Sequence, residues 1–353
     1  MNLKTVRDVD VKNKVVMVRA DYNVPIEDGK ITSDLRIKAS LETLDYLRQA
    51  GAKKIIIISH LGRPEGVDKK LSLKPVAVAL DKMIGKVTFV PEVSGPEVEK
   101  TAAGLAEGGI LVLENLRFYP DEKANSEEFI KKIIDATGAE IFVQDGFAVV
   151  HRAHASVEAV AKVLPVYAGL LLEKEITNLE KVTKDPARPV LLIIGGAKVE
   201  DKKPLIEKFA NGLADQIVVG GKIAADGYLA SDKIYVAEDF DEDATGAKLD
   251  IGPLATGKIA EQILAAKTIL WNGLMGKAED PAYATSSTIV ADLMGEKVDA
   301  ETIICGGDTT GFVENLAETN PNLKYSLVST GGGAALEFLL GNKLPGLEII
   351  EKI

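Results

Sequence analysis

The stretch VLLIIGGAKVEDK, residues 190–202, holds the pattern that decides the fold. Its continuous run of branched apolar residues, Val190–Ile194, is typical of a strand buried on both faces of a parallel sheet. Gly195 and Gly196 interrupt the run, and charged residues follow where a helix can begin. In such strand–glycine–helix units, ligands bind beyond the carboxyl ends of the strands.

The same succession of apolar run, turn and helical pattern recurs along the whole chain. Short β-branched runs alternate with helical patterns, and no low-complexity stretch interrupts them. This alternation predicts an α/β fold with a doubly wound parallel sheet, formed twice. The predicted strands are 14–24, 53–60, 87–91, 109–118 and 141–147 in the first half, and 190–196, 216–221, 233–237, 268–273, 302–307 and 325–330 in the second.

Length and composition narrow the class of protein. A chain of 353 residues is too long for one ordinary core, so two domains are expected. The net charge of −11 argues against nucleic acid or an anionic membrane surface as the main partner. The single cysteine, Cys305, cannot form an internal disulfide, which suits a reducing cytoplasm. No apolar run is long enough for a membrane span, and a cytoplasmic protein is expected.

The arginines are distributed unevenly and point to an anion site. All eight precede residue 190, and lysine alone supplies positive charge beyond it. A guanidinium group binds two oxygens of a carboxylate or phosphate at once. Arginines placed at strand ends therefore predict one concave site for a small, multiply charged anion. Five of them follow or precede apolar runs beside turn signals: Arg19, Arg36, Arg63, Arg117 and Arg152.

Polar residues next to these arginines allow more than one interpretation. His60 and His154 favour oxyanion binding, whereas His151 fits helix capping or packing equally well. Asp21 and Asn23 share one face of a strand. They fit either turn chemistry or recognition of a substrate hydroxyl. Zinc is disfavoured because no cysteine or carboxylate has ligand spacing near the histidines.

The second half has glycine clusters in place of arginines. Glycine lets backbone N–H groups approach a phosphate closely, and a helix N-terminus favours its charge. Three such loops after strands, at Gly195, Gly306 and Gly331, predict a phosphate-binding edge, although each alone is a weak signal. The clusters are Gly195–Gly196, Gly220–Gly221, Gly306–Gly307 and Gly331–Gly333.

Three charged residues in these loops also allow two interpretations each. Lys198 and Lys202 share one face if a helix has begun, and two ammonium groups there suit a transferring phosphoryl group. They are equally typical of a solvated helix start. Asp308 fits either a helix cap or a ligand of Mg²⁺ on a nucleotide.

Taken together, the motifs resemble the phosphoglycerate kinase family from one end of the chain to the other. They occur in that family's order, which makes the resemblance cover the whole chain. The motifs are RADYNVP, SHLGRP, LENLRFYP, HRAHAS, GGAKVEDK, LDIGP, WNGLMG, GGDT and STGGGAALE.

The resemblance implies an architecture and a reaction. Residues 1–165 would bind phosphoglycerate, with 342–353 packing back on them. Residues 166–184 would form an interdomain helix, and 185–341 would bind the nucleotide. The reaction would be reversible phosphoryl transfer between 1,3-bisphosphoglycerate and Mg-ADP, giving 3-phosphoglycerate and Mg-ATP. Hinge closure and charge stabilisation would act without a covalent intermediate, in a monomer with Mg²⁺ as cofactor and no nucleic-acid or membrane partner.

The resemblance also implies a role for each matched residue in the first half. Arg36 would face the acyl phosphate and stabilise the moving phosphoryl group, and His154 would support the basic patch. The substrate would be held by Asp21, Asn23, Arg36, His60, Arg63, Arg117 and Arg152.

In the second half, Lys202 would contact the transferring phosphoryl group and Asp308 would hold Mg²⁺. Gly307, Gly331 and Gly332 would supply catalytic backbone donors. The nucleotide would be bound by Gly195, Gly196, Lys198, Lys202, Gly220, Gly221, Asn272, Glu279, Gly306, Gly307, Asp308 and Thr309.

Departures from the family pattern concentrate in the nucleotide half. Lys222 stands where a third glycine usually follows Gly221, and Leu274, Lys277 and Ala278 depart from the family's WNGPMGVFE loop. The stretch Lys222–Leu249 is also expected to be shorter than in the family. These departures fall on the part of the implied site that would contact the nucleotide base.

Two other classes of function compete with a kinase. A binding protein on the same fold that no longer turns over is disfavoured by the phosphoryl-transfer charges Lys198, Lys202 and Asp308. A nucleotide-dependent oxidoreductase is disfavoured because no G-x-G-x-x-G follows a strand. A serine hydrolase fits poorly, since a G-x-S-x-G elbow is lacking.

Overall fold

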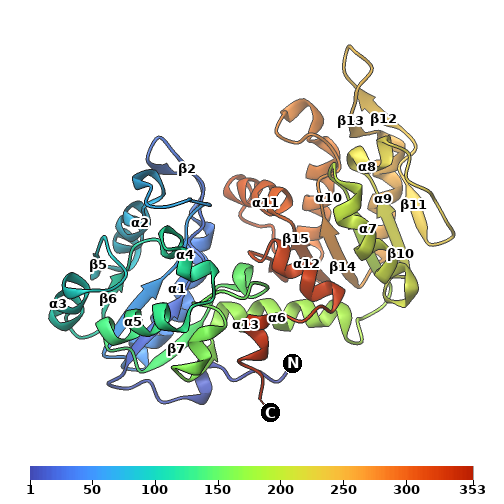
Figure 1. Ribbon diagram of the computed structural model, residues 1–353. Coiled ribbons are helices and arrows are strands. Elements are labelled where there is room, and N and C mark those ends of the chain that lie inside the picture. Colours follow the sequence, from blue (N-terminus) through green and yellow to red (C-terminus); the bar gives the residue numbers. More distant parts are fainter. Residues whose placement is uncertain (353) are drawn as a thin grey trace. The chain divides into compact units, whose positions relative to one another are not determined.

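The structure, a computed structural model, describes residues 1–352 and consists of two compact units. Unit 1 comprises Met1–Lys174 together with the chain from Lys343 onward, and unit 2 comprises Glu175–Asn342. The division falls inside helix α6 (Leu170–Thr183), labelled in Figure 1. Among the described residues, no helix combines the length and the apolar character needed to span a bilayer.

A six-stranded parallel sheet forms the centre of unit 1. Its strand order is β5-β6-β4-β1-β7-β8, so strands far apart in the chain are neighbours in the sheet. The first strand, β1, lies inside the sheet and pairs in parallel with β4 and β7. The strands are β1 (Val15–Arg19), β4 (Lys54–Ile58), β5 (Val87–Phe89), β6 (Gly109–Val112), β7 (Ile141–Gln144) and β8 (Val166–Ala168).

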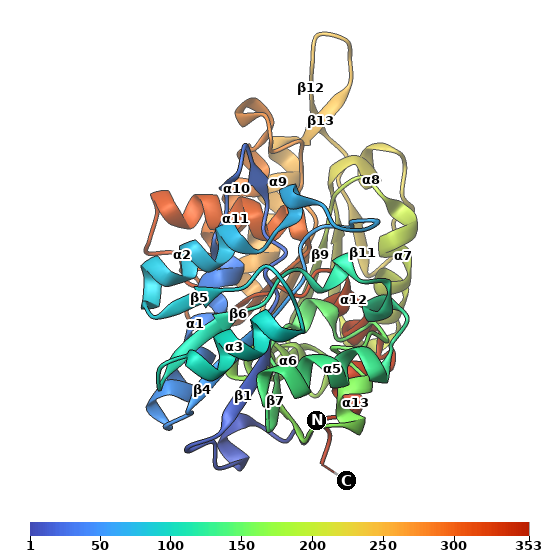
Figure 2. The same cartoon turned by 60° about the vertical axis from the view of Figure 1, so that its left-hand side comes forward.

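Helices cover both faces of this sheet, as the two views in Figures 1 and 2 show. In α5, apolar residues at three- and four-residue spacing form the stripe that faces the core. Ser126 begins this helix by accepting a hydrogen bond from the backbone N–H of Phe129 at 3.2 Å. The helices are α1 (Leu35–Gln49), α2 (Lys74–Ile84), α3 (Pro96–Gly104), α4 (Pro120–Lys123), α5 (Glu127–Thr137) and α13 (Pro345–Glu348), with short 3₁₀ turns at Val6–Asp8, Lys69–Leu71, Leu116–Phe118, Phe147–Val149 and Ala159–Lys162.

The C-terminal segment belongs to unit 1, where α13 contacts the loop after β7. The backbone N–H of Gly346 donates to the carbonyl of Val150 at 2.9 Å. A Cβ at Gly346 would lie 2.9 Å from the Val150 Cα, so a glycine is required for this approach. The backbone N–H of Lys4 donates to the carbonyl of Ile350 at 2.9 Å, which joins the two ends of the chain.

The helix predicted over 166–184 was wrong at its start. Residues Val166–Ala168 form the edge strand β8, and α6 begins at Leu170. At Gly169 between them, a Cβ would lie 2.0 Å from Oδ1 of Asp145. That oxygen accepts a hydrogen bond from the backbone N–H of Leu171 at 3.1 Å and satisfies a donor at the helix start. Burial raises the pKa of the Asp145 carboxyl to about 7.

Unit 2 repeats the architecture with a second six-stranded parallel sheet. Its strand order is β11-β10-β9-β14-β15-β16. The strands are β9 (Val190–Ile194), β10 (Gln216–Val219), β11 (Ile234–Val236), β14 (Thr268–Asn272), β15 (Glu301–Cys305) and β16 (Leu327–Val328). The surrounding helices are α7 (Val199–Lys208), a π-helical turn (Phe209–Leu213), α8 (Gly221–Ala225), α9 (Pro253–Ala265), a 3₁₀ turn (Pro281–Tyr283), α10 (Thr285–Glu296), α11 (Gly307–Thr319) and α12 (Gly333–Leu340).

The predicted fold class, a doubly wound α/β sheet formed twice, is confirmed. Each predicted strand is present, although most are shorter than predicted. The sequence analysis missed β8 and two hairpins, because segments of two to four residues carry little periodic signal. The hairpins are β2 (Ile26–Glu27) with β3 (Lys30–Ile31), and β12 (Phe240–Glu242) with β13 (Lys248–Ile251).

Candidate active site

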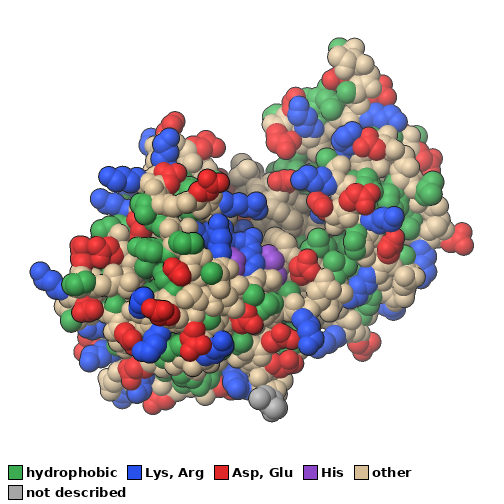
Figure 3. Space-filling model, viewed as in Figure 1, with side chains coloured by type: hydrophobic (Ala, Val, Ile, Leu, Met, Phe, Trp, Pro, Cys, Tyr) green, Lys and Arg blue, Asp and Glu red, His purple; other side chains and the backbone are tan. Residues whose placement is uncertain are grey.

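Four adjacent strands of unit 1 end beside the charged residues that the sequence singled out. Arg117 follows β6, and His60 follows β4. Arg19 ends β1, and Arg152 follows β7. Because parallel strands end at the same edge of a sheet, residues far apart in the chain meet there. Figure 3 shows Lys and Arg side chains gathered beside histidine side chains on unit 1.

Arg19 is a buried support for this edge rather than an exposed ligand. Its side chain donates to Oγ of Ser156 at 2.9 Å and to the carbonyl of Ala20 at 2.5 Å. Its Nη2 lies 3.0 Å from Nδ1 of His60. Burial lowers the pKa of Arg19 to about 10, against the opposing effect of Glu122. The Arg19 guanidinium therefore links residues at the ends of neighbouring strands through its contacts with protein atoms.

Asp21 and Asn23 organise their neighbours. Asp21, which is 5% exposed, forms an ion pair with Arg36 in the first turn of α1. Its Oδ1 also accepts from the backbone N–H of Asn23 at 3.3 Å, so the turn chemistry considered for these residues is present. Asn23 in turn accepts from the backbone N–H of Gly62 at 2.8 Å. The pair thus orients Arg36 and the loop that carries Arg63.

The remaining arginines differ in how many of their hydrogen-bond donors are already engaged by protein atoms. Arg117 donates through Nη1 to the carbonyl of Gly62 at 2.7 Å, and its buried Nε has no partner among the described residues. Arg152 donates through Nε to Nε2 of His151 at 3.1 Å. Arg63 is exposed, and within residues 1–352 its side chain has no hydrogen-bond or ion-pair partner. Arg63 and Arg152 therefore retain donors for an anion.

Electrostatics keep the histidines of this site neutral. Burial lowers the pKa of His60 well below its usual value, and the charges of Arg19 and Arg117 lower it further. Burial, followed by Arg117 and Arg152, lowers the pKa of His154 to about 4. Burial is the larger cause of both shifts, and the arginine charges add to it. A polyanion would offset those arginine charges.

Glu122 is a buried acid that the sequence analysis missed. It is 1% exposed, and its carboxylate accepts from the backbone N–H and Oγ of Ser156 at 3.0 and 2.6 Å. Its charge raises the pKa values of Arg19 and Arg117. An acid in a first helical turn after proline is typical of a solvated residue, so no sequence signal marks it.

In unit 2 the predicted residues surround a cavity of about 510 Å³. Strands β10, β9, β14 and β15, which are neighbours in the sheet, lead into its walls. The missed lining residues include Lys248 and Leu249, from the hairpin that the sequence analysis did not predict, and Asp201. The predicted lining residues are Gly195, Gly196, Lys198, Lys202, Asn272, Glu279, Gly306, Gly307, Asp308 and Thr309.

The glycines at this cavity have two different physical reasons. A Cβ on Gly195 would lie 2.2 Å from the carbonyl oxygen of Leu274, and one on Gly273 would lie 2.1 Å from the carbonyl oxygen of Gly195. These two residues are therefore required for the close approach of the loops after β9 and β14. A Cβ on Gly307 would meet nothing within 4 Å. Gly307 begins α11 beside the cavity, where backbone donors suit a phosphate.

Two lysines enter the cavity from the start of α7. Lys202 donates through Nζ to Oδ1 of Asn272, and burial lowers its pKa. Lys198 is the N-cap residue with extended backbone, φ −107°, so the helix has not yet begun there and the condition for one shared helical face is not met. Both side chains nevertheless line the same cavity, which excludes a purely solvated helix start for the partly buried Lys202.

Asp308 is the second residue of α11, and Gly306 occupies the N-cap position of this helix. The interpretation of Asp308 as the N-cap residue is therefore wrong. Thr309 accepts through Oγ1 from the backbone N–H of Gly273 at 2.9 Å and ties α11 to the neighbouring loop. An exposed carboxylate beside a helix N-terminus fits Mg²⁺, which binds one or two carboxylates together with substrate phosphates.

Two predicted glycine clusters are absent from the cavity lining within the described chain. Gly220 is buried behind it, since a Cβ there would lie 2.7 Å from the Met275 sulfur. Gly331 and Gly332 follow β16, the edge strand next to β15. The preceding Thr330 is held by Glu175, which accepts from its backbone N–H and Oγ1 at 2.7 and 2.9 Å. Gly221, like Gly220, supports the adjacent backbone.

The chain matches the family model described as phosphoglycerate kinase over residues 6–245 and 225–342. It belongs to the phosphoglycerate kinase family. The phosphoglycerate kinases of Moorella thermoacetica and Dictyoglomus turgidum are 40% and 38% identical to it, covering 97% and 98% of this chain and 98% and 97% of theirs. Crystallised phosphoglycerate kinase from Pyrococcus horikoshii superposes with a TM-score of 0.86 at 27% identity, and the Coxiella burnetii structure with 0.80 at 31% identity, each covering 98% of both chains.

The comparisons confirm the resemblance to phosphoglycerate kinases and the prediction of a kinase. They also bear on the stretch expected to be short. The two matched segments overlap at residues 225–245, within Lys222–Leu249. The alignment with the Moorella protein is 391 residues long, more than the 353 residues of this chain. The relative therefore carries residues that this chain lacks.

Proposed function

We propose that this protein transfers a phosphoryl group reversibly between 1,3-bisphosphoglycerate and Mg-ADP, giving 3-phosphoglycerate and Mg-ATP. It does so in the cytoplasm as a monomer, with the phosphoglycerate on unit 1 and the nucleotide on unit 2. The observation that carries the proposal is the chemistry of two separate anion sites. Unit 1 has arginines with neutral histidines, and unit 2 has lysines, a carboxylate and glycine loops.

On unit 1, the arginines with donors to spare bind the phosphate of the glycerate. Arg63 and Arg152 contact it directly, and Arg117 and His60 add donors from deeper in the site. His154 stays neutral and supports the basic patch. Asp21 and Asn23 meet the hydroxyl end and hold Arg36 toward the acyl phosphate. The excess positive charge around His60 supports this assignment.

On unit 2, Lys198, Thr309 and the backbone of Gly306–Gly307 bind nucleotide phosphates, while Asn272 and Glu279 bind nearer the nucleoside. Asp308 holds Mg²⁺, which when bound neutralises charge on the phosphates. Gly331 and Gly332 supply backbone donors beside this edge. Gly220 and Gly221 shape the floor on which Gly195 and Gly196 lie.

Transfer needs compensation of charge on the moving phosphoryl group rather than a covalent intermediate. Arg36 and Lys202 supply that compensation, each held by a protein oxygen until the substrate oxygen replaces it. The Asp21 carboxylate and the Asn272 amide thus position the two cations in advance. A binding protein without turnover would have no use for a partly buried, charge-stabilising lysine.

A coupled assay for ATP formation from 1,3-bisphosphoglycerate, ADP and Mg²⁺ tests the proposal. We expect turnover that depends on all three components. Calorimetry with 3-phosphoglycerate and ADP runs beside it. Binding of both ligands without any turnover would favour the silent binding protein instead.

A further inference from the structure

Unit 1 contains a cavity of about 1120 Å³, larger than that of unit 2. The hairpin β2–β3, the loop before α2, one face of α2 and the segments after β5 and β6 form its walls. None of Arg36, His60, Arg63, Arg117 and Arg152 lines it. The roles proposed for those residues therefore leave this cavity unexplained.

Helix α2 carries an exposed apolar side chain in addition to those that it buries in the core. Val76 and Leu80 are fully buried and face the core of unit 1. Val78, four residues before Lys82, lies on a different face, lines the cavity and is 49% exposed. Across the cavity, Val67 is 75% exposed. Large apolar side chains left open to water on two walls are typical of a ligand site rather than of a core.

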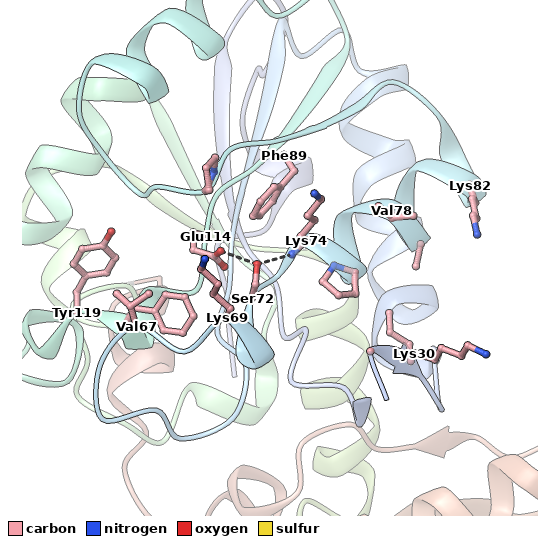
Figure 4. A pocket seen from close by; sticks show the side chains of 16 residues that line it. Lys30, Val67, Lys69, Ser72, Lys74, Val78, Lys82, Phe89, Glu114 and Tyr119 are labelled. Carbon is pink, nitrogen blue, oxygen red and sulfur yellow. Dashed lines mark hydrogen bonds between the residues drawn. The ribbon is translucent and has the colours of Figure 1, made fainter. Parts of the chain in front are cut away.

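The two ends of the cavity differ in the apolar surface that they offer. Figure 4 shows Val67 and Tyr119 toward one end, with Lys69 close to them, and Lys30 and Lys82 toward the other. Lys74 lies between these ends, beside Phe89. Ammonium groups thus lie along the whole cavity, and Val67 and Tyr119 add apolar and aromatic surface at one end.

The lysines of this cavity lack charge partners. Within the described residues, the ammonium groups of Lys30, Lys69, Lys74 and Lys82 have no hydrogen-bond or ion-pair partner. The single lining acid, Glu114, is already used: it accepts from Oγ of Ser72 at 2.7 Å and from backbone N–H groups at 2.8 and 2.9 Å. Four uncompensated cations in a protein of net charge −11 select an anion.

We propose that this cavity is a binding site for a small amphipathic anion with an apolar body and a carboxylate or similar head. Its alkyl or aromatic body lies against Val67 and Tyr119, and its head lies among Lys30, Lys74 and Lys82. Charge and apolar surface are both needed, because isolated surface lysines would bind any anion only weakly. The site does not depend on the phosphoryl-transfer reaction.

The test uses the full chain with saturating ADP, Mg²⁺ and 3-phosphoglycerate, so that the other two anion sites are filled. The probe is anilinonaphthalene sulfonate, followed by fluorescence, and the matched neutral probe is phenylnaphthylamine, which lacks only the sulfonate. We expect saturable binding of the sulfonate probe and its displacement by dodecanoate but not by dodecanol.

Lys82→Ala should weaken the sulfonate probe about tenfold, the size of one charge-assisted hydrogen bond, and leave the neutral probe unchanged. Lys100→Ala, at an exposed lysine of α3 without a partner, is the matched control. Val67→Ser should weaken both probes. Equal affinities in Lys82→Ala and Lys100→Ala, or absence of saturable probe binding in the presence of saturating ADP and 3-phosphoglycerate, would overturn the proposal. So would binding to anionic vesicles without binding of free dodecanoate.

Discussion

Nη2 of Arg19 lies 3.0 Å from Nδ1 of His60, with both side chains buried at the edge of the same sheet. A guanidinium can only donate, so Nδ1 must accept and the proton of the neutral imidazole resides on Nε2. Burial, and after it the charges of the neighbouring arginines, lower the pKa of His60 and favour this neutral state. Nε2 of His60 is therefore an N–H donor, which fits the role proposed for His60 in binding a substrate oxygen.

Replacing Arg36 should slow the chemical step. Arg36→Ala removes a donor that Asp21 orients, and one such donor at a transition state typically contributes about 3–4 kcal/mol. We expect kcat to fall accordingly. Arg188→Ala, at an exposed ion pair with Asp215, is the control and should leave kcat near wild type. An Arg36→Ala enzyme that keeps most of its kcat would remove Arg36 from the mechanism.

Replacing Lys202 should affect turnover but not the binding of 3-phosphoglycerate. Lys202→Ala should abolish most turnover, whereas the affinity for 3-phosphoglycerate, measured by calorimetry, should hardly change. The reason is that Lys202 lines the cavity of unit 2, whereas the arginines belong to unit 1. Lys203→Ala, at the adjacent exposed position, serves as control. Loss of 3-phosphoglycerate binding in Lys202→Ala would contradict the assignment of ligands to units.

The neutral histidines predict how stability depends on pH. In the folded protein the pKa of His154 is about 4, below its ordinary 6.5, so the unfolded chain binds more protons between these values. The contribution of His154 to the free energy of unfolding should therefore be fully present above about pH 6.5 and decline as the pH falls toward 4. Urea denaturation of wild type and His154→Gln at several pH values isolates this contribution, because titrations common to both cancel. Identical pH profiles would show that His154 does not carry it.

A polyanion should reduce the same acid sensitivity. Bound 3-phosphoglycerate neutralises the arginine charges that lower the histidine pKa values, so protonation of the folded state becomes less unfavourable. The difference between the profiles with and without ligand tests this effect.

Glu122 should be important for stability although it was invisible in the sequence. Glu122→Gln keeps the shape but removes the negative charge that acts on Arg19 and Arg117 and weakens the hydrogen bonds to Ser156, so the free energy of unfolding should fall. Glu128→Gln, at an exposed pair with Lys132, should change the free energy of unfolding by less than about 1 kcal/mol. Equal stability of the two variants in urea would mean that Glu122 carries no such role.

The nucleotide cavity predicts weak selection of the base. Its side chains include few apolar walls, Ala197, Leu249 and Leu274, and no aromatic ring from the described residues lines it. One contact between the base and an apolar side chain contributes on the order of 1–3 kcal/mol, so a pocket that lacks such contacts distinguishes ATP less well from other nucleotides. GTP or ITP should support turnover within about tenfold of ATP in kcat/KM. Titrations of the three nucleotides at saturating 3-phosphoglycerate and Mg²⁺ decide this, and a preference for ATP beyond about a hundredfold would contradict it.

The sequence by itself determined the two doubly wound sheets and the family. Apolar runs such as Val190–Ile194 are local, and their alternation with helical patterns needs no knowledge of distant contacts. The charged motifs were equally visible, because each lies in one short segment at a strand end. Those segments were enough to predict an anion site in each half.

Only the tertiary structure decided what each residue does within those sites. Arg19 and Arg63 look alike in the sequence, yet one is buried among protein acceptors and the other is exposed. Glu122 is hydrogen-bonded to Ser156, which is distant in the sequence, and the lysines near Val78 share a cavity with residues of other segments. The physical reason is that burial, counter-charge and pKa depend on neighbours brought together by strand pairing, and local periodicity carries no record of which strands pair.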